Sequence, residues 1–331
     1  MFGMPPQVVL VIGLALVFDF LNGVHGSSNI LATMISSRAF RPWAALTLTA
    51  VAEFIGPFIF GLAVARTIGS EVFEASSINL HVLIAALAGA ILWNLLTWSL
   101  HLPSSSSQGL IGGLLGAVLL SAGLGAVKTG GLVKVFAALF AAPLIGFGLG
   151  FIFTRLIFYL VKGVSPRINE FFKSSQLVTA LVLALSHGAN DAQKAMGIIV
   201  LSMVIGGVLP DFHVPLWVVT VCAAGMALGT ALSGWRFIRT LGGRFYKIRP
   251  VHSFSAQATS AIVILFSSLV GWPVSTTQVA SSAIIGVGSS ERLGKVRWGA
   301  VGEILMSWLL TIPATALVSA GVYWLIIKYI L

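Results

Sequence analysis

The chain has 331 residues, of which 57% are hydrophobic and only 8% are charged. With a mean hydropathy of +1.01, a soluble domain would expose large apolar surfaces to water. The composition therefore excludes that class and predicts a polytopic membrane protein in contact with lipid. The formal net charge of +10 then indicates basic cytoplasmic loops and no nucleic-acid partner. Cys222 is the sole cysteine in the sequence, which rules out an internal disulfide.

The apolar stretches, taken in chain order, predict membrane-embedded helices, because about 20 residues cross a bilayer. No Lys or Arg precedes Arg38, which favours a first membrane helix over a signal peptide. Stretches of about thirty residues or more are expected to be broken or strongly tilted. Two stretches with polar beginnings, 104–126 and 274–289, are expected to be re-entrant elements or half-helices. The remaining stretches are 7–37, 42–65, 80–101, 131–161, 176–205, 214–235, 253–271 and 298–331.

The basic residues predict the orientation. Thirteen of the 19 Lys and Arg residues fall in four loops that one threading places on the same side. The positive-inside rule makes that side the cytoplasm, with the N-terminus outside. We therefore expect a multi-pass protein of the cytoplasmic membrane, with a cytoplasmic linker at 162–175. The thirteen residues are Arg38, Arg41, Lys162, Arg167, Lys173, Arg236, Arg239, Arg244, Lys247, Arg249, Arg292, Lys295 and Arg297.

Two pairs of motifs indicate an internal repeat. The sequence GVHG at 23–26 aligns with GAND at 188–191, and LPSSSSQ at 102–108 aligns with WPVSTTQ at 272–278. The loop after the first motif is basic and the loop after its second copy has no base, so the copies have opposite sidedness. The predicted fold is all-α, with an inverted-topology repeat formed by 1–161 and 176–331. This architecture is typical of secondary transporters.

Each repeat contains two polar motifs that we expect to interrupt helices at membrane depth. Irregular backbone survives there only where it lines a cavity or is buried in protein. The motifs are the Gly-rich segments 22–29 and 186–194 and the two Pro-hydroxyl segments. Proline suits the first turn of a helix, and a helix N-terminus with hydroxyls suits an anion. The alternative is that Ser and Thr hydroxyls only join helices to each other.

Asp191 and Lys194 are three residues apart and share one face of a helix. They form either a neutralising pair or a site in which Asp191 holds a cation or proton and Lys194 lies near an anion. Asp19 and His25 are the other titratable candidates. The roles of Glu53 and Glu303 stay open.

The motifs DFLNGVHGSSNILAT, LSHGANDAQKAMG, LPSSSSQGLIGGLLG and WPVSTTQVASSAIIGVG resemble the paired signatures of the inorganic phosphate transporter (PiT) family, and the resemblance covers nearly the whole chain. It implies symport of inorganic phosphate with a cation, without a cofactor. The implied substrate site, with Lys194 added for its charge, comprises Asn29, Ser105, Ser106, Ser107, Asn190, Asp191, Lys194, Ser275, Thr276 and Thr277. The implied sodium site comprises Asp19, Asn22, Asn190 and Asp191. For coupling to protons the candidates are Asp19, Asn22, His25 and Asp191.

Two departures from the family pattern favour protons over sodium. The first motif has Gly26 where the family has an aspartate, and the second has Gln193 and Lys194, which is similar to the proton-coupled bacterial branch. A missing carboxylate removes a hard ligand for a cation, and an added ammonium repels one.

The expected function is import of inorganic phosphate, as the free anion or a metal–phosphate complex, with protons by alternating access. The alternatives are a sodium-coupled phosphate symporter, a sulfate permease of the same fold and a passive anion channel. A hydrolase using Ser275 or Ser105 with His187 or His25 is disfavoured, because no such pair is close in sequence, and the chain is not expected to be an enzyme. Lipid is an expected partner, and a homo-oligomer is left open.

Overall fold

The structure is a computed structural model that describes residues 4–74, 78–100, 104–165, 167–233 and 248–329, apart from the side chain of Asn29. Helices make up nearly all of these residues, and the described part contains no β-strand beyond an isolated bridge between Phe73 and Val127. Five of the described helices are long and apolar enough to cross a membrane. This confirms the prediction of an all-α membrane protein with several spans.

Each predicted apolar stretch contains one main helix. The first half has α1 (Pro6–Ser36), α2 (Pro42–Ile59), α3 (Ala63–Arg66), the π-helix η1 (Thr67–Glu71), α4 (Leu80–Ser99), α5 (Ser106–Ala122), η3 (Leu124–Ala126) and α6 (Thr129–Leu160). The second half has α7 (Ile168–Ile205), α8 (Leu216–Ala231), α10 (Pro250–Leu269), α11 (Thr276–Glu291), η4 (Leu293–Lys295) and α12 (Trp298–Tyr329). Within the predicted linker 162–175, α7 already begins at Ile168.

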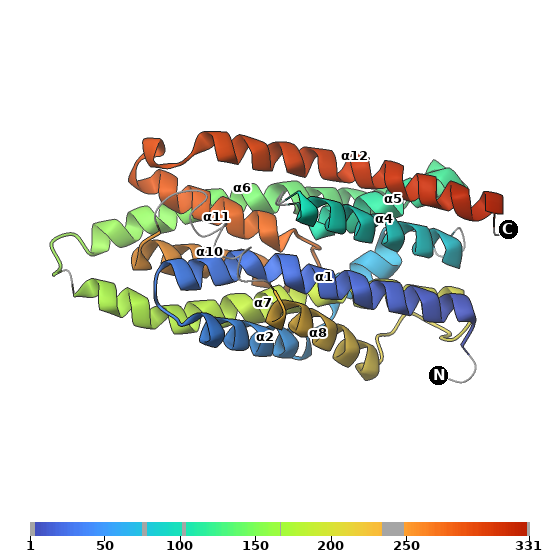
Figure 1. Cartoon of the computed structure of the whole chain (residues 1–331), viewed down its shortest axis with the longest axis horizontal. Coiled ribbons are helices and arrows are strands. Elements are labelled where there is room, and N and C mark those ends of the chain that lie inside the picture. The colour runs from blue at the N-terminus through green and yellow to red at the C-terminus, as the bar shows by residue number, and fades with distance from the viewer. Residues whose placement is uncertain (1–3, 75–77, 101–103, 166, 234–247, 330–331) are drawn as a thin grey trace.

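Helices of the first half pack on helices of the second half, and corresponding helices do so in corresponding pairs. Helix α1 packs on α8 of the second half, while its sequence counterpart α7 packs on α2 of the first half. In the same manner α5 packs on α12, while α11 packs on α6. Figure 1 shows that α1 and α7 run in opposite directions, as do α6 and α12. Neither half therefore forms a bundle without the other.

The expected breaks at 22–29 and 186–194 are wrong, because α1 and α7 are continuous helices through these segments. The glycines serve close packing instead. A Cβ atom at Gly23 would lie 2.1 Å from the carbonyl oxygen of Met226 on α8, and one at Gly188 would lie 2.2 Å from that of Glu53 on α2. Small residues of this kind let helix backbones approach each other within a membrane. The long helices α6 and α12 are also continuous, although they contain Pro143 and Pro313.

The two Pro-hydroxyl segments begin short helices, α5 with 17 residues and α11 with 16. The N-cap residues are Ser105 and Ser275, whose hydroxyls accept hydrogen bonds from the backbone N–H groups of Gln108 (3.1 Å) and Gln278 (3.4 Å). The expected place of proline in the first helical turn is wrong for Pro273, which precedes α11 because Ser275 takes the capping position. Pro103 lies outside the described residues.

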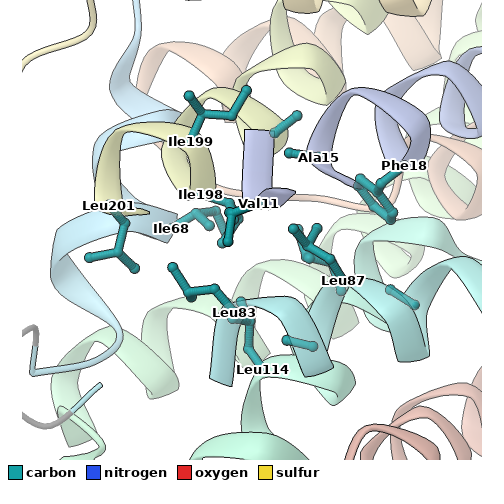
Figure 2. Packing of buried hydrophobic residues seen from close by; sticks show 14 of the residues in the cluster. Val11, Ala15, Phe18, Ile68, Leu83, Leu87, Leu114, Ile198, Ile199 and Leu201 are labelled. Carbon is teal, nitrogen blue, oxygen red and sulfur yellow. The ribbon is translucent and has the colours of Figure 1, made fainter. Parts of the chain in front are cut away.

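The interior differs between the two ends of the molecule. We name the end with the basic loops between α1 and α2, α6 and α7, and α11 and α12 the basic end, and the other the opposite end (Figure 1). Towards the opposite end, apolar side chains of α1, η1, α4, α5 and α7 fill the interior (Figure 2). We call these the apolar cluster: Val11, Ala15, Phe18, Ile68, Leu83, Leu87, Leu114, Ile198, Ile199 and Leu201.

Towards the basic end, hydrogen-bonded polar side chains join α1, α7 and α10. Gln257 donates to the Thr33 hydroxyl (3.0 Å) and accepts from Thr179 (2.7 Å), and Ser253 donates to the Thr33 carbonyl (2.9 Å). Ser37 donates to Gln176 at 2.7 Å. We call this set the polar seam: Thr33, Ser37, Gln176, Thr179, Ser253 and Gln257.

The close packing of α2 on α7 at Gly56 can be tested by substitution. A Cβ atom there would lie 2.1 Å from the carbonyl oxygen of Leu185, so Gly56→Ala must push α2 away from α7. We expect a loss of about 1–3 kcal/mol, measured as a lower unfolding temperature in detergent. The matched control is Gly148→Ala in α6, which meets no atom within 4 Å. An equal or smaller loss in Gly56→Ala would contradict the packing argument.

Candidate functional site

The pair of Asp191 and Lys194 lies in the middle of α7, and each side chain is only 1% exposed. The Lys194 ammonium donates to Asp191 Oδ1, to the hydroxyl of Ser107 (2.6 Å) and to the carbonyl oxygen of Val274 (2.9 Å). Three donors thus meet three acceptors, which uses the full hydrogen-bonding capacity of an ammonium group. The charge of Lys194 is therefore compensated inside the protein.

The same pair brings the beginnings of both short helices together. Ser107 lies in the first turn of α5, and Thr276 in the first turn of α11 donates to Asp191 Oδ2 at 2.8 Å. Ser107 also donates to the carbonyl of Val274 at 3.1 Å, just before α11. The positive ends of two helix dipoles and two hydroxyls therefore converge on one buried ion pair. Such an arrangement suits a bound oxyanion.

A second chain of contacts leads from Asp191 to α2 and α8. His187 Nε2 lies 3.3 Å from Asp191 Oδ2, and His187 Nδ1 lies 2.7 Å from Glu53 Oε1. The other oxygen of Glu53 accepts a hydrogen bond from Thr230 on α8. From the sequence, His187 was assigned no role beyond the disfavoured hydrolase, and the role of Glu53 stayed open. The spacing of four residues between His187 and Asp191, which share a helix face, was the available signal.

Gly26 lies directly beside this chain. A Cβ atom at Gly26 would be 2.7 Å from His187 Nε2 and 3.6 Å from Asp191 Oδ2. The position at which the family pattern has an aspartate therefore faces the site, and the imidazole of His187 takes up the space that a side chain would need. Position 26 therefore adds no carboxylate beside His187 and Asp191.

The predicted cation ligands leave several buried acceptors without donors. Neither carboxylate oxygen of Asp19 has a hydrogen-bond partner among the described residues, and the side chain is fully buried. Its charge interacts with those of Asp191, Lys194 and Glu53. Asn190 donates to Ser268 and to the carbonyl of Trp272, both at 3.1 Å, while its own oxygen is unpaired within the described part. Buried acceptors of this kind fit a proton or a monovalent cation.

Asn22 and the other predicted site residues contact residues other than Asp191 and Lys194. Ser106 donates to Asn22 Oδ1 at 2.5 Å, which links α5 to α1. Ser105 and Ser275 are N-caps, Thr277 is half-buried in the first turn of α11, and the side chain of Asn29 lies outside the description. His25 contacts the Leu21 carbonyl (2.8 Å) and lies edge-on to Trp98 on α4. In the described residues no group of three or more His, Cys, Asp and Glu side chains is arranged to hold a metal ion.

The fold and this cluster define a multi-pass helical membrane protein with a buried ionic site where two short helices begin. The model of the Phosphate transporter family matches residues 22–319, and the chain belongs to this family. It is 42% identical over 320 residues to a probable low-affinity inorganic phosphate transporter of Rhizobium meliloti (strain 1021), covering 96% of both chains. A protein of the same description from Bacillus subtilis (strain 168) is 40% identical, again over 96% of both.

A solved structure has the same fold. It is described as a sodium-dependent phosphate transporter, and it superposes with a TM-score of 0.90 over 99% of this chain and 100% of its own. The sequence identity is 23%, so this likeness supports the fold alone.

Burial of the ion pair predicts an unusual pattern of stabilities. Lys194→Met leaves the Asp191 carboxylate buried without its cation, and Asp191→Asn leaves the ammonium without its anion. Each single variant should lose about 3–5 kcal/mol, whereas the double variant should recover most of that loss. Thermal unfolding of the purified proteins in detergent measures this. Additive losses in the double variant would show that the two charges do not compensate each other.

Proposed function

We propose that this protein is a secondary symporter that imports inorganic phosphate into the cell with protons, by alternating access between two inverted repeats. The observation that supports this most directly is the convergence of both short helices on Asp191 and Lys194. An ammonium, the hydroxyls of Ser107 and Thr276, and two helix N-termini offer several donors to the oxygens of a tetrahedral anion. The proposed substrate site includes the remaining hydroxyls Ser105, Ser106, Ser275 and Thr277, with Asn29 and Asn190.

Asp191 favours phosphate over sulfate in this proposal. Hydrogen phosphate still carries a proton and can donate a hydrogen bond to a carboxylate, whereas sulfate has only acceptors. A site built to receive a donated hydrogen bond discriminates strongly against an analogue that lacks the donor. Sulfate would place an acceptor oxygen against the Asp191 carboxylate.

Coupling to protons is supported by the charges around the pair. Lys194 supplies a resident positive charge, and Gly26 contributes no carboxylate to a cation site. The carboxylates of Asp19 and Glu53 and the ring of His187 offer places for a proton near Asp191. A sodium ion at Asp19, Asn22, Asn190 and Asp191 is the alternative. Both carboxylate oxygens of Asp19 and the amide oxygen of Asn190 have no hydrogen-bond partner among the described residues.

Alternating access is supported by the difference between the two ends. The apolar cluster fills the space between α1, α4 and α7 beyond the ion pair (Figure 2), which excludes water and ions from that side. The polar seam offers hydrogen-bonding groups between the ion pair and the basic end. In this proposal the basic end faces the cytoplasm and the N-terminus lies outside. The apolar cluster then closes the substrate route from outside, and the polar seam lines it on the cytoplasmic side.

Uptake in proteoliposomes tests the function. An imposed inward proton gradient should drive accumulation of labelled phosphate, an imposed sodium gradient should not, and a tenfold excess of sulfate should leave the rate unchanged. Asp191→Asn should reduce driven uptake by more than tenfold, because the site loses its titratable acceptor. Gly148→Ala, outside the site, is the control. Accumulation driven by sodium alone, or full activity of Asp191→Asn, would overturn the coupling proposal.

Thiol labelling tests the path and the orientation. Cys222 is the sole cysteine, so a Cys222→Ala background permits single reporters. Thr179→Cys in the polar seam should react with a membrane-impermeant reagent from the cytoplasmic side, and phosphate should slow the reaction severalfold. Leu87→Cys, in the apolar cluster, should not react from that side under the same conditions. Equal reactivity of both positions would contradict a polar inward path.

A further inference from the structure

A cavity of about 410 Å³ lies towards the opposite end, apart from the central ion pair. The segment 62–71 forms one wall, α6 another, and the end of α10 the third. Its polar lining comes from Arg66, Thr67, Glu71 and Lys134. Because one water takes up about 30 Å³ in the liquid, the space admits a small hydrated anion.

The charges of the cavity leave a surplus of positive charge. The Lys134 ammonium is held by Glu71 (2.8 Å) and Thr67 (3.1 Å), with 31% of the lysine side chain exposed. The guanidinium of Arg66, by contrast, is exposed and makes no hydrogen bond or ion pair with any described residue. Free, solvent-accessible guanidinium groups are strong ligands for phosphate oxygens, because their planar fork can donate two hydrogen bonds at once.

The cavity walls are bonded to the central site. Gly271 lines the cavity at φ +73°, and a Cβ atom there would lie 3.0 Å from Thr67 Oγ1. The next residues of that segment reach the site, because the carbonyl of Trp272 accepts from Asn190 and that of Val274 accepts from Lys194. The wall formed by the segment 62–71 is bonded to α7, the helix that carries Asn190 and Lys194. Gln193 on α7 accepts from the N–H groups of Val64 (2.9 Å) and Ala65 (3.2 Å).

We propose that this cavity is an outer binding site for inorganic phosphate, occupied by the anion before it reaches Lys194. The inference rests on the proposed direction of transport, which places the opposite end outside the cell. Arg66 binds the anion from solvent, Lys134 adds a second positive charge, and Glu71 keeps Lys134 in place. The segment 270–275 links the two sites, because Val270 and Gly271 line the cavity and the carbonyl of Val274 accepts from Lys194. A positive cavity raises the local anion concentration at the entrance.

The test is a comparison of charge variants on the outer face. Arg66→Gln should raise the KM for external phosphate about three- to tenfold with kcat within twofold of wild type, while Arg66→Lys should recover much of the loss. The difference should shrink at high ionic strength, where exposed charges are screened. Lys328→Gln is the matched control, since Lys328 is an exposed base at the same end of the molecule that contacts Trp324 and does not line the cavity.

The outcomes separate the outer site from the proposed function. If wild-type protein accumulates phosphate but Arg66→Gln keeps the wild-type KM, the outer site is refuted and the symporter stands. An equal rise of KM in Lys328→Gln would also refute it, because the effect would then come from net surface charge. If wild-type protein accumulates no phosphate in any gradient, the function itself fails. Binding of labelled phosphate to Asp191→Asn, weakened further by adding Arg66→Gln, would still support the outer site.

Discussion

Asp191 and Lys194 place opposite charges on one face of α7, in the interior of a membrane protein. Neither charge is tolerable there alone, since an unpaired buried charge costs several kcal/mol. Their mutual contact leaves hydrogen-bonding groups on both side chains. Lys194 also donates to Ser107 and to the carbonyl of Val274, and Asp191 accepts from Thr276. Because these partners come from α5, α11 and the segment before α11, the ion pair fixes where both short helices begin.

This constraint also suggests how transport and coupling are linked in the proposed cycle. The ammonium of Lys194 has three donors, and Asp191, Ser107 and the carbonyl of Val274 accept all three. A phosphate that takes up these donors must displace Asp191, which then remains as a buried carboxylate without its cation. A proton on His187, whose Nε2 lies 3.3 Å from Asp191 Oδ2, offsets that charge and leaves the carboxylate able to accept a hydrogen bond from the phosphate. Binding of the anion therefore favours binding of the proton, which is the thermodynamic requirement for symport.

The sequence predicted the membrane class and all the main helices, because apolar runs of sufficient length have few alternatives. It also indicated that 188–191 and 275–277 belong to one site, through the paired motifs. The predicted helix breaks were wrong, because glycine can either interrupt a helix or allow two helices to pack closely. Gly23 and Gly188 suggested interrupted helices, but they permit backbone contact with Met226 and Glu53. Local sequence does not distinguish the two uses, since the deciding atoms belong to helices more than thirty residues away.

The contacts of Glu53 and Thr230 were beyond sequence reasoning for a related reason. Glu53 lies on α2 and Thr230 on α8, two apolar helices far apart in sequence. Only the packing of α2 on both α7 and α8 brings Glu53 to His187 and Thr230 to Glu53. A single carboxylate in an apolar run is compatible with a relay, a structural acceptor or a helix end. The three-dimensional partner decides among these, and here it is an imidazole that also faces Asp191.

The two copies of the predicted repeat differ at the site, and charge balance offers a physical reason. Position 26 aligns with Asp191, and an aspartate there would face the same imidazole and stand close to the first carboxylate. Two like charges at that distance require an additional cation to be stable. With Gly26 and Lys194, the Asp191 carboxylate is paired with an ammonium of the chain itself. The first half contributes neutral donors such as Ser107 and the acceptor Glu53. In the proposed function this resident ammonium takes the place of a cation bound at Asp191, while the buried carboxylates of Asp19 and Glu53 are left for protons.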